Sequence, residues 1–277
     1  MEDAKWKLSE KAETFTLLRP LNEPKGGPLD LTIDTSLLDP AIEYVKGLRN
    51  WTDTESEFWK WHLTENWTNE SHTATTGRLY GSWSNIPREL RGLLLIKGQP
   101  TAEVDIKSAQ PTMLVKLYKN RDSKECKRFI RIIESGWFYE CIMRDLEDKN
   151  RDRTKTEVMS FLCGRMKGTP SIYKFFKDHL PELLTEIEEL RKTDYRTLAR
   201  MLQRFESDII VRNICRRFPV YSMHDGAICQ VSVAQEVKKA TEEAVLDYCG
   251  IRAKVTVEDK RSILESVAIR SAPAKAA

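Results

Sequence analysis

The chain has 277 residues, of which 40% are hydrophobic and 31% charged, which suffices for one large or two small packed domains. Its 45 basic and 42 acidic residues leave a net charge of +3, so only local patches can argue for a nucleic-acid partner. No apolar run approaches the roughly 18 to 20 residues of a membrane span, and the charged start does not resemble a secretory signal. We therefore expect a globular cytoplasmic protein without a membrane partner.

The cysteines and histidines indicate neither zinc nor a disulfide framework. The six cysteines include no C-x-x-C pair, and the four histidines show no H-E-x-x-H spacing.

The N-terminal part of the chain predicts an irregular segment followed by helices. Residues 20–30 are rich in Pro and Gly. Asp39-Pro40 is a plausible helix start, and a second, Trp-rich helical stretch covers about 55–67. We expect the tryptophans of this part to form a small core, with base stacking as the alternative. They are Trp51, Trp59, Trp61 and Trp67.

From Arg78 onward the pattern changes to short strands that flank a long helical insert. Strand-like segments precede Asp105, helical patterns run from Ala109 to Arg217, and two further strands flank Asp225. A helix, a strand and a last helical piece follow. This order predicts an α+β domain whose sheet is assembled from distant segments. Such a sheet would bring Asp105 and Asp225 together, although 120 residues separate them.

Asp225 has a structural and a catalytic interpretation. Asp225-Gly226 between two alternating apolar strands is a strong hairpin signal, because Gly accepts the positive φ of a tight turn. A rigid hairpin tip also presents a carboxylate on a fixed strand end, as a metal site requires. The local sequence leaves both open.

Asp105 poses the same choice. It closes an apolar strand and precedes a helix-compatible segment, so it can be a helix cap. Alternatively, Asp105 and Asp225 jointly hold two Mg²⁺ ions, one activating an attacking hydroxyl and the other neutralising a leaving phosphate. Hard oxygen ligands suit Mg²⁺, and substrate phosphates and waters would complete its coordination.

A basic stripe marks a third candidate. Arg151, Lys155, Met159 and Cys163 are spaced four apart, so on a helix they share one face. Cations at a helix N-terminus oppose the macrodipole unless an anion is bound, which predicts a phosphate site. The alternative is a solvated helix start with a Thr154–Glu157 capping box.

Two further basic segments are weaker candidates. The predicted helix from about Tyr195 to Arg217 buries one stripe and carries Arg, Gln and Ser on another face, which can contact nucleic acid. That face consists of Arg196, Arg200, Gln203 and Ser207. Residues 116–131 hold seven basic and two acidic residues, although such a stretch is more often solvated surface.

Five segments together resemble the motifs of family A DNA polymerases, in the same order, over about residues 76–260. These segments are TGRLYGSWSNIP, EVDIKSAQP, RDRTKTEVMSFLCG, QRFESDII and YSMHDG. The third aligns without a gap on its Arg, Lys and terminal Gly. The resemblance implies a right-hand polymerase of the α+β class, with an antiparallel palm sheet, helical fingers, a reduced thumb-like N-terminal region and no exonuclease domain.

The resemblance also implies a domain division and a set of partners. The expected parts are a thumb-like or accessory helical region at 1–75, the first part of the palm at 76–115, the fingers at 116–202 and the second part of the palm at 203–277. Two Mg²⁺ ions, or Mn²⁺ in their place, would serve as cofactors. Primer–template nucleic acid and nucleoside triphosphates would be the partners, with room for an unidentified processivity or replication partner.

Site residues carry over position by position. Asp105 and Asp225 would be the catalytic, metal-binding aspartates, with Ile106 also at the metal site. The expected nucleotide-binding residues are Arg151, Lys155, Met159, Gln110 and Cys163. The expected primer–template residues are Arg78, Gln203, His224 and Arg200. The primer 3′-hydroxyl would attack the α-phosphate in line and release pyrophosphate, with positioning and metal electrostatics carrying the catalysis.

Four positions depart from the family pattern. Gln110 replaces the Glu that packs beneath the sugar and rejects a 2′-hydroxyl, so sugar discrimination is open. Met159 replaces the fingers aromatic, as in phage-type RNA polymerases, and Cys163 replaces a tyrosine. Gly226 takes the place of a second acid, which leaves two carboxylates. We expect a template-directed DNA polymerase without proofreading, with an RNA polymerase or primase of this fold, or a catalytically inactive nucleic-acid-binding module, as alternatives.

Overall fold

The computed structural model describes residues 30–67, 71–165 and 169–271. Within these ranges a six-stranded antiparallel sheet has the order β1-β4-β5-β7-β6, with β8 also paired to β5, and β2 pairs separately with β3. The strands are β1 (Leu31–Ile33), β2 (Ser71–Thr73), β3 (Leu79–Gly81), β4 (Leu94–Ile96), β5 (Gln99–Ile106), β6 (Tyr221–Met223), β7 (Gly226–Gln230) and β8 (Val255–Glu258).

Helices fill the intervals that the sequence pattern assigns to them. They are α1 (Leu38–Arg49), α2 (Asp53–Thr64), α3 (Ala109–Leu114), α4 (Lys124–Ser135), α5 (Phe138–Asp145), α6 (Arg151–Cys163), α7 (Pro170–His179), α8 (Pro181–Arg191), α9 (Thr197–Ile209), α10 (Cys215–Arg217), α11 (Ala234–Cys249) and α12 (Arg261–Ser271). A π-helical turn, Ile210–Ile214, joins α9 to α10. The predicted mixed α+β class and the antiparallel sheet are confirmed.

Strand β5 lies at the centre of the sheet and has two different faces. It pairs with β7 along one edge and with β4 and β8 along the other. Side chains alternate between faces along a strand, so Ala102, Val104 and Ile106 enter the main core while Glu103 and Asp105 point to the opposite face. This alternation separates the packing residues from the acidic ones.

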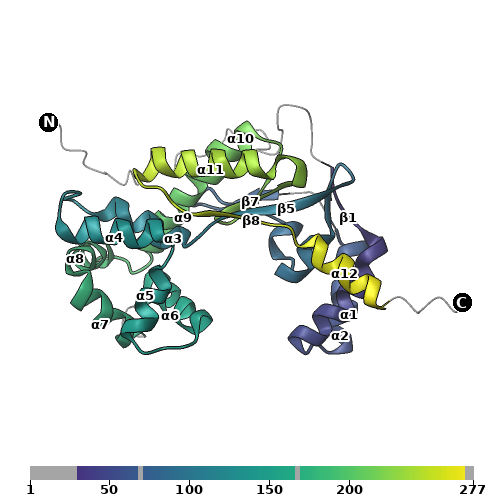
Figure 1. Ribbon diagram of the computed structural model, residues 1–277, viewed down its shortest axis with the longest axis horizontal. Coiled ribbons are helices and arrows are strands. Elements are labelled where there is room, and N and C mark those ends of the chain that lie inside the picture. The colour runs from purple at the N-terminus through teal and green to yellow at the C-terminus, as the bar shows by residue number, and fades with distance from the viewer. Residues whose placement is uncertain (1–29, 68–70, 166–168, 272–277) are drawn as a thin grey trace, which may run out of the picture.

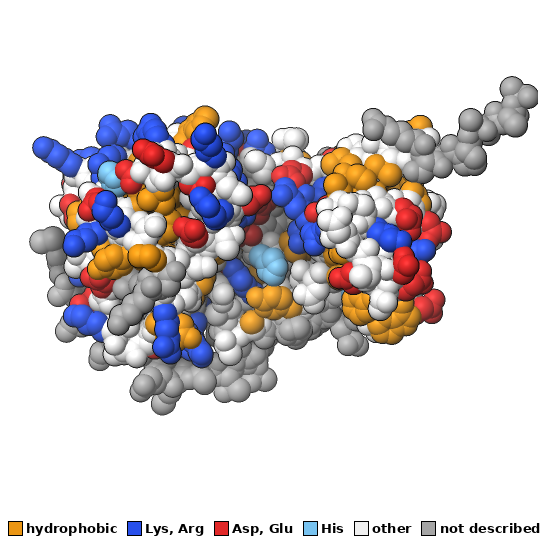
Figure 2. Space-filling view, turned by 90° about the horizontal axis from the view of Figure 1, so that it is seen from below, with side chains coloured by type: hydrophobic (Ala, Val, Ile, Leu, Met, Phe, Trp, Pro, Cys, Tyr) orange, Lys and Arg blue, Asp and Glu red, His pale blue; other side chains and the backbone are white. Residues whose placement is uncertain are grey.

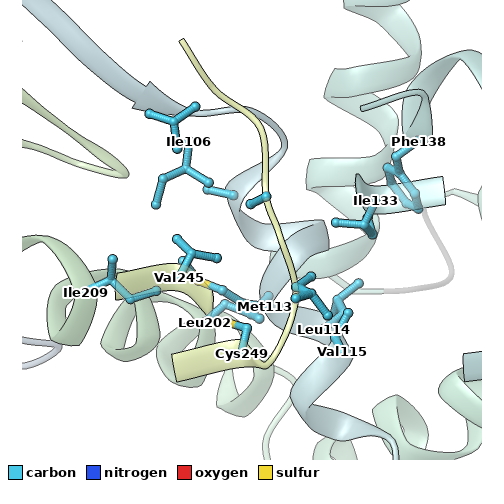
Figure 3. Packing of buried hydrophobic residues seen from close by; sticks show 14 of the residues in the cluster. Ile106, Met113, Leu114, Val115, Ile133, Phe138, Leu202, Ile209, Val245 and Cys249 are labelled. Atoms are coloured by element: carbon cyan, nitrogen blue, oxygen red, sulfur yellow. The ribbon is translucent and has the colours of Figure 1, made fainter. Parts of the chain in front are cut away.

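The main core lies between one face of the sheet and helices α9 and α11 (Figure 1). Ile106 at the end of β5, Met113 of α3, Leu202 of α9 and Val245 of α11 are all at most 1% exposed and point toward one another (Figure 3). Burying such side chains contributes about 1.5 to 3 kcal/mol each. This packing fixes the direction in which β5 ends and α3 begins.

A second core joins the N-terminal helices α1 and α2 to α12. Trp51, Trp59 and Trp67 pack partly buried against it, as predicted. Trp61 is 51% exposed, so the prediction that it belongs to the core is wrong. Trp59 and Leu63 are four apart and face inward on α2, which turns the intervening Trp61 outward.

Two groups of helices extend from opposite ends of the sheet, on the side away from α11 (Figure 1). Helices α4 to α8 form one group, and α1, α2 and α12 form the other.

Of the predicted region 1–75, residues 1–29 and 68–70 lie outside the described residues, while 31–33 join the main sheet as β1. In the part of the chain that the structure describes, no helix is both long and apolar enough to cross a membrane.

The second core depends on Trp83. Its ring is fully buried, meets Tyr221 edge-on at 4.7 Å between centroids, and donates from Nε1 to the Ser222 carbonyl at 3.0 Å. We expect Trp83→Ala to lower the free energy of unfolding by about 3 to 5 kcal/mol. The control Trp61→Ala, at an exposed position, should change it by less than about 0.5 kcal/mol. Urea unfolding followed by circular dichroism measures both, and equal losses would contradict this account of the core.

Candidate active site

A cleft of about 590 Å³ opens on the acidic face of the sheet and brings together segments distant in sequence. Its lining includes residues 103–111 at the end of β5 and start of α3, residues 223–227 at the β6–β7 turn, and three residues of α6. Figure 2 shows this side of the molecule hollowed between the two helical groups, with basic, acidic and histidine side chains around the hollow. The sequence prediction that distant segments meet here is confirmed.

The register of β5 against β7 places the two aspartates beside each other. Asp105 is paired with Gly226, directly after Asp225, and the Ile106 amide donates to the Asp225 carbonyl at 3.4 Å. A Cβ on Gly226 would lie 2.4 Å from the Val104 carbonyl oxygen. Only glycine allows the turn to come this close to β5, so Gly226 brings the carboxylates together.

The hairpin differs from the predicted one in which residue adopts a positive φ. His224 adopts the positive φ of 52°, whereas the described glycines with positive φ do not include Gly226. The prediction that Gly226 supplies the positive φ is therefore wrong, and its role is close approach. The helix-cap interpretation of Asp105 is also wrong, because Asp105 lies within β5 and Ser108 precedes α3 as its N-cap residue.

Both aspartates have a raised pKa. Burial is the main cause of the raised pKa of Asp105, and the negative charge of Asp225 adds to it, while Lys155 opposes it. Burial likewise raises the pKa of Asp225, opposed by the charges of Arg78, His224 and Lys155. Two partly desolvated carboxyls of like charge favour a proton or a cation between them.

Helix α6 presents its basic stripe to the same cleft. Arg151, Lys155 and Met159 line it, as the four-residue spacing predicts. The predicted capping box is wrong, because Asn150 is the N-cap and accepts from the Arg153 amide at 3.0 Å. Within the described parts of the chain Lys155 makes no ion pair, and its charge acts on both aspartates.

Arg151 already has partners. Its Nε donates to Glu140 Oε1 at 2.9 Å, and its guanidinium lies 5.2 Å from the centre of the Tyr139 ring. Both partners belong to α5, and Tyr139 lines the cleft. Sequence reasoning did not single out these two residues, and neither carries a local signal for this role.

A chain of polar contacts forms another part of the wall. Arg78 forms a buried ion pair with Glu206 of α9, and the nearby Gln110 amide of α3 helps to lower the pKa of the same carboxylate. Cys163 at the end of α6 donates from Sγ to Gln110 Oε1 at 3.5 Å. Cys163 therefore reaches the site through Gln110 and does not line the cleft itself. Burial raises the pKa of Glu206 to about 7, although Arg78 opposes the shift.

Further ion pairs continue the acidic face beyond Asp105. Arg91 reaches Glu103 at 3.3 Å and Arg88 reaches Glu258 at 2.6 Å, and all four residues line the cleft. Strand pairing sets Glu103 opposite Glu258. Sequence reasoning missed this group, although Glu103 shares the two-residue alternation of Asp105.

The predicted primer–template residues lie partly at the cleft and partly outside it. His224 lines the cleft, its ring meets that of Tyr80 edge-on at 5.7 Å between centroids, and burial lowers its pKa. Arg200 is exposed and pairs with Asp194 at 2.8 Å, and neither it nor Gln203 lines the cleft. Their contact with a primer–template stays a prediction.

The basic segment 116–131 interacts largely with its own fold. The Lys116 ammonium lies 4.0 Å from the centre of the Tyr248 ring, and Arg121 donates to the Cys249 carbonyl at 2.8 Å. None of the segment lines the cleft. It therefore adds no basic surface to this site.

The metal-ligating oxygens at the cleft suit a cation whose remaining ligands come from the substrate and from water. Among the described residues no group of three or more His, Cys, Asp or Glu is arranged to hold a metal ion. The cleft instead offers two adjacent half-buried carboxylates, Asp105 and Asp225, each with a raised pKa. Such a pair supplies hard oxygen ligands and leaves most of a Mg²⁺ coordination sphere to phosphates and water.

Comparisons with known proteins add a fold-level likeness. No protein-family model matches the chain, and no curated protein does. The solved structures with a similar fold include the POL domain of Pol1 from M. smegmatis in complex with DNA primer-template and dNTP. The two share 13% identity with a TM-score of 0.48, over 69% of this chain and 47% of the matched one. This chain thus spans about half the length of that polymerase domain.

The raised pKa of Asp105 gives a pH-dependent stability prediction. In the metal-free protein the unfolded carboxyl ionises near its ordinary pKa of 3.8, while the folded one retains its proton to higher pH. Stability is therefore lost as the pH rises from about 4 through the raised folded pKa. We expect Asp105→Asn to stabilise the metal-free protein above this range by about 1 to 3 kcal/mol.

Thermal unfolding in EDTA from pH 4 to 9 measures this difference. The gain in melting temperature from Asp105→Asn should be near zero at pH 4 and grow with pH, while the exposed control Asp247→Asn should show no such trend. A stabilisation independent of pH would contradict the raised pKa of Asp105.

Proposed function

We propose that the protein is a template-directed nucleotidyltransferase that extends a primer 3′-hydroxyl with nucleoside triphosphates and acts as a small DNA polymerase. The observation that carries the proposal is the meeting of Asp105 and Asp225 with Arg151 and Lys155 across one cleft. Paired carboxylates opposite paired cations suit phosphoryl transfer, in which charge spreads over the transferred phosphate. The antiparallel sheet would act as the palm and α4 to α8 as the fingers.

Asp105 and Asp225 would hold the Mg²⁺ ions, with Ile106 beside them. When bound, the ions would activate the attacking hydroxyl and neutralise the leaving phosphate. The residues themselves supply a rigid frame, because Asp105 is fixed in β5 and Asp225 by the turn that Gly226 allows. Rigid placement of this kind favours a geometry near that of the transition state.

Arg151 and Lys155 would bind the triphosphate. They lie on one face of α6 in its first two turns, and Lys155 acts electrostatically on both aspartates. A triphosphate held along this face would place its α-phosphate between Lys155 and the carboxylate pair. Met159 would follow on the same face, next to the sugar and base.

Arg78 and His224 would meet the primer end. Both line the cleft next to Asp225, and both oppose the rise in its pKa. Arg78 is held in place by Glu206, so it presents a fixed cation. Contacts of Gln203 and Arg200 with the duplex belong to the same proposal but lie outside the cleft.

Extension of a labelled primer on a DNA template with Mg²⁺ tests the proposal. We expect wild-type protein to extend with deoxynucleotides and Asp225→Asn to lose at least about 10³-fold in rate, because charge stabilisation supplies most of the catalysis. The exposed Asp247→Asn should retain wild-type activity. Extension with ribonucleotides alone would favour RNA or primer synthesis, and tight primer–template binding without extension would favour an inactive binding module.

Lys155→Ala separates triphosphate binding from primer binding. We expect it to raise the KM for the nucleotide about tenfold or more, since one charge-assisted contact contributes about 1.5 to 3 kcal/mol, while the Kd for primer–template changes little. Lys174→Ala, at a 79% exposed side chain on α7, is the matched control. A Lys155→Ala protein with weakened duplex binding and an unchanged nucleotide KM would contradict the assignment of α6.

A further inference from the structure

A second cavity, of about 410 Å³, lies among the helices α4, α5 and α7. It shares no lining residue with the cleft that holds Asp105 and Asp225, although α5 contributes to both. Phe138 and Cys141, three residues apart, face the cavity on one side of α5, while Tyr139 faces the cleft on the other. A ligand of this cavity would therefore not occupy the space in which the triphosphate is proposed to bind.

The inner wall of the cavity is aromatic and buried. Phe129 of α4, Phe138 of α5 and Phe175 of α7 line it, and each is at most 7% exposed. The rings of Phe129 and Phe138 meet edge-on at 5.9 Å between centroids. Leu180 adds a further buried side chain. Rings held in this way offer flat apolar contact to the ring of a ligand.

The rim of the cavity carries positive charge. Arg128 and Arg144 are exposed and line it. Arg128 donates to the His179 carbonyl at the end of α7, which fixes its guanidinium beside the cavity and leaves further N–H groups for a ligand. Asp145, the carboxylate among the lining residues, pairs with His179 Nε2 at 2.8 Å. Within the described ranges neither arginine forms an ion pair, so both are available to an anion.

The dimensions of the cavity favour a small molecule over a protein partner. Small-molecule sites typically measure about 300 to 1,000 Å³, with apolar walls and a few well-placed polar groups. A protein partner would instead need about 800 Å² of contact surface. None of the exposed large hydrophobic side chains in the described part of the chain lines this cavity. The apolar surface is thus confined to the interior of the cavity.

We propose that this cavity is a second ligand site, which binds a small aromatic molecule carrying a phosphate or carboxylate group. The ring lies against Phe129, Phe138 and Phe175, and the anionic group is held by Arg128 and Arg144. Planar guanidinium groups match the geometry of both oxyanions and can form two parallel hydrogen bonds to either. The inference goes beyond the proposed nucleotidyltransferase function and does not depend on it.

Fluorescence titration with anilinonaphthalene sulfonate tests the site, because this probe combines aromatic rings with one anionic group. The uncharged phenylnaphthylamine is the matched probe without the anion. We expect wild-type protein to bind the sulfonate about tenfold more tightly than the uncharged probe, since hydrogen bonds to a charged group are the stronger ones. Phenyl phosphate and benzoate then serve as competitors. Displacement by the first alone indicates a phosphate ligand, displacement by the second alone indicates a carboxylate, and displacement by neither would contradict the proposed ligand class.

Arg144→Gln is the central variant, because Arg144 is exposed and forms no ion pair with the described residues. We expect it to raise the Kd of the sulfonate about tenfold and to leave that of the uncharged probe unchanged. Arg131→Gln, at an exposed position of α4 that does not line the cavity, is the matched control. Thermal unfolding verifies that both variants fold. Equal affinity of wild type and Arg144→Gln for the sulfonate would overturn the inference.

Cys141 gives an independent readout of where the probe binds. It is half-buried and lines the cavity, while the half-buried Cys163 lies at the end of α6 beside Gln110. We expect the sulfonate to slow the alkylation of Cys141 by N-ethylmaleimide and to leave that of Cys163 unchanged, as peptide mass spectrometry measures. Protection of Cys163 alone, or an uncharged probe that binds as tightly as the sulfonate, would show that this cavity is not an anion site.

Discussion

The close approach of β5 and the β6–β7 turn is the constraint on which the rest of the site depends. It forces Asp105 and Asp225 together in a buried place, where their like charges repel. Gly226 makes the approach sterically allowed, and the core beneath β5 holds it against the repulsion. The positive charges of Lys155 and Arg78 reduce the repulsion.

The sequence predicts those parts of the site that follow from periodicity. Alternation along β5 puts the side chains of Asp105 and Val104 on opposite faces of the sheet. The four-residue spacing on α6 puts Lys155 and Met159 on the same face of the helix. The sequence misassigns local backbone geometry. Gly226 is the residue type expected at a turn position with positive φ, but its role here is to let the turn pack closely against β5. Steric demands from a neighbouring strand leave no trace in the hairpin sequence itself.

Partners of the charged residues are harder to predict, because each pair joins segments far apart in the chain. Arg78 and Glu206 are 128 residues apart, and Arg88 and Glu258 are 170 apart. Glu206 does carry one signal: a carboxylate at the i+4 position of the buried stripe that begins at Leu198 and Leu202 requires a cationic or amide partner. Periodicity shows that such a partner exists, but only tertiary packing identifies it as Arg78.

The ion pairs of the cleft divide into fixed and exchangeable ones. Arg151 and Glu140 have side chains 41% and 27% exposed, and a pair of that exposure contributes only about 0 to 1 kcal/mol. The proposed triphosphate would therefore take the place of Glu140 at little cost. Arg78 and Glu206 are 13% and 1% exposed, and separating a buried pair costs about 3 to 5 kcal/mol. Arg78 therefore stays paired with Glu206 when a ligand binds. The cleft thus combines one arginine, Arg151, that can exchange its partner for a ligand with a second, Arg78, that keeps its partner.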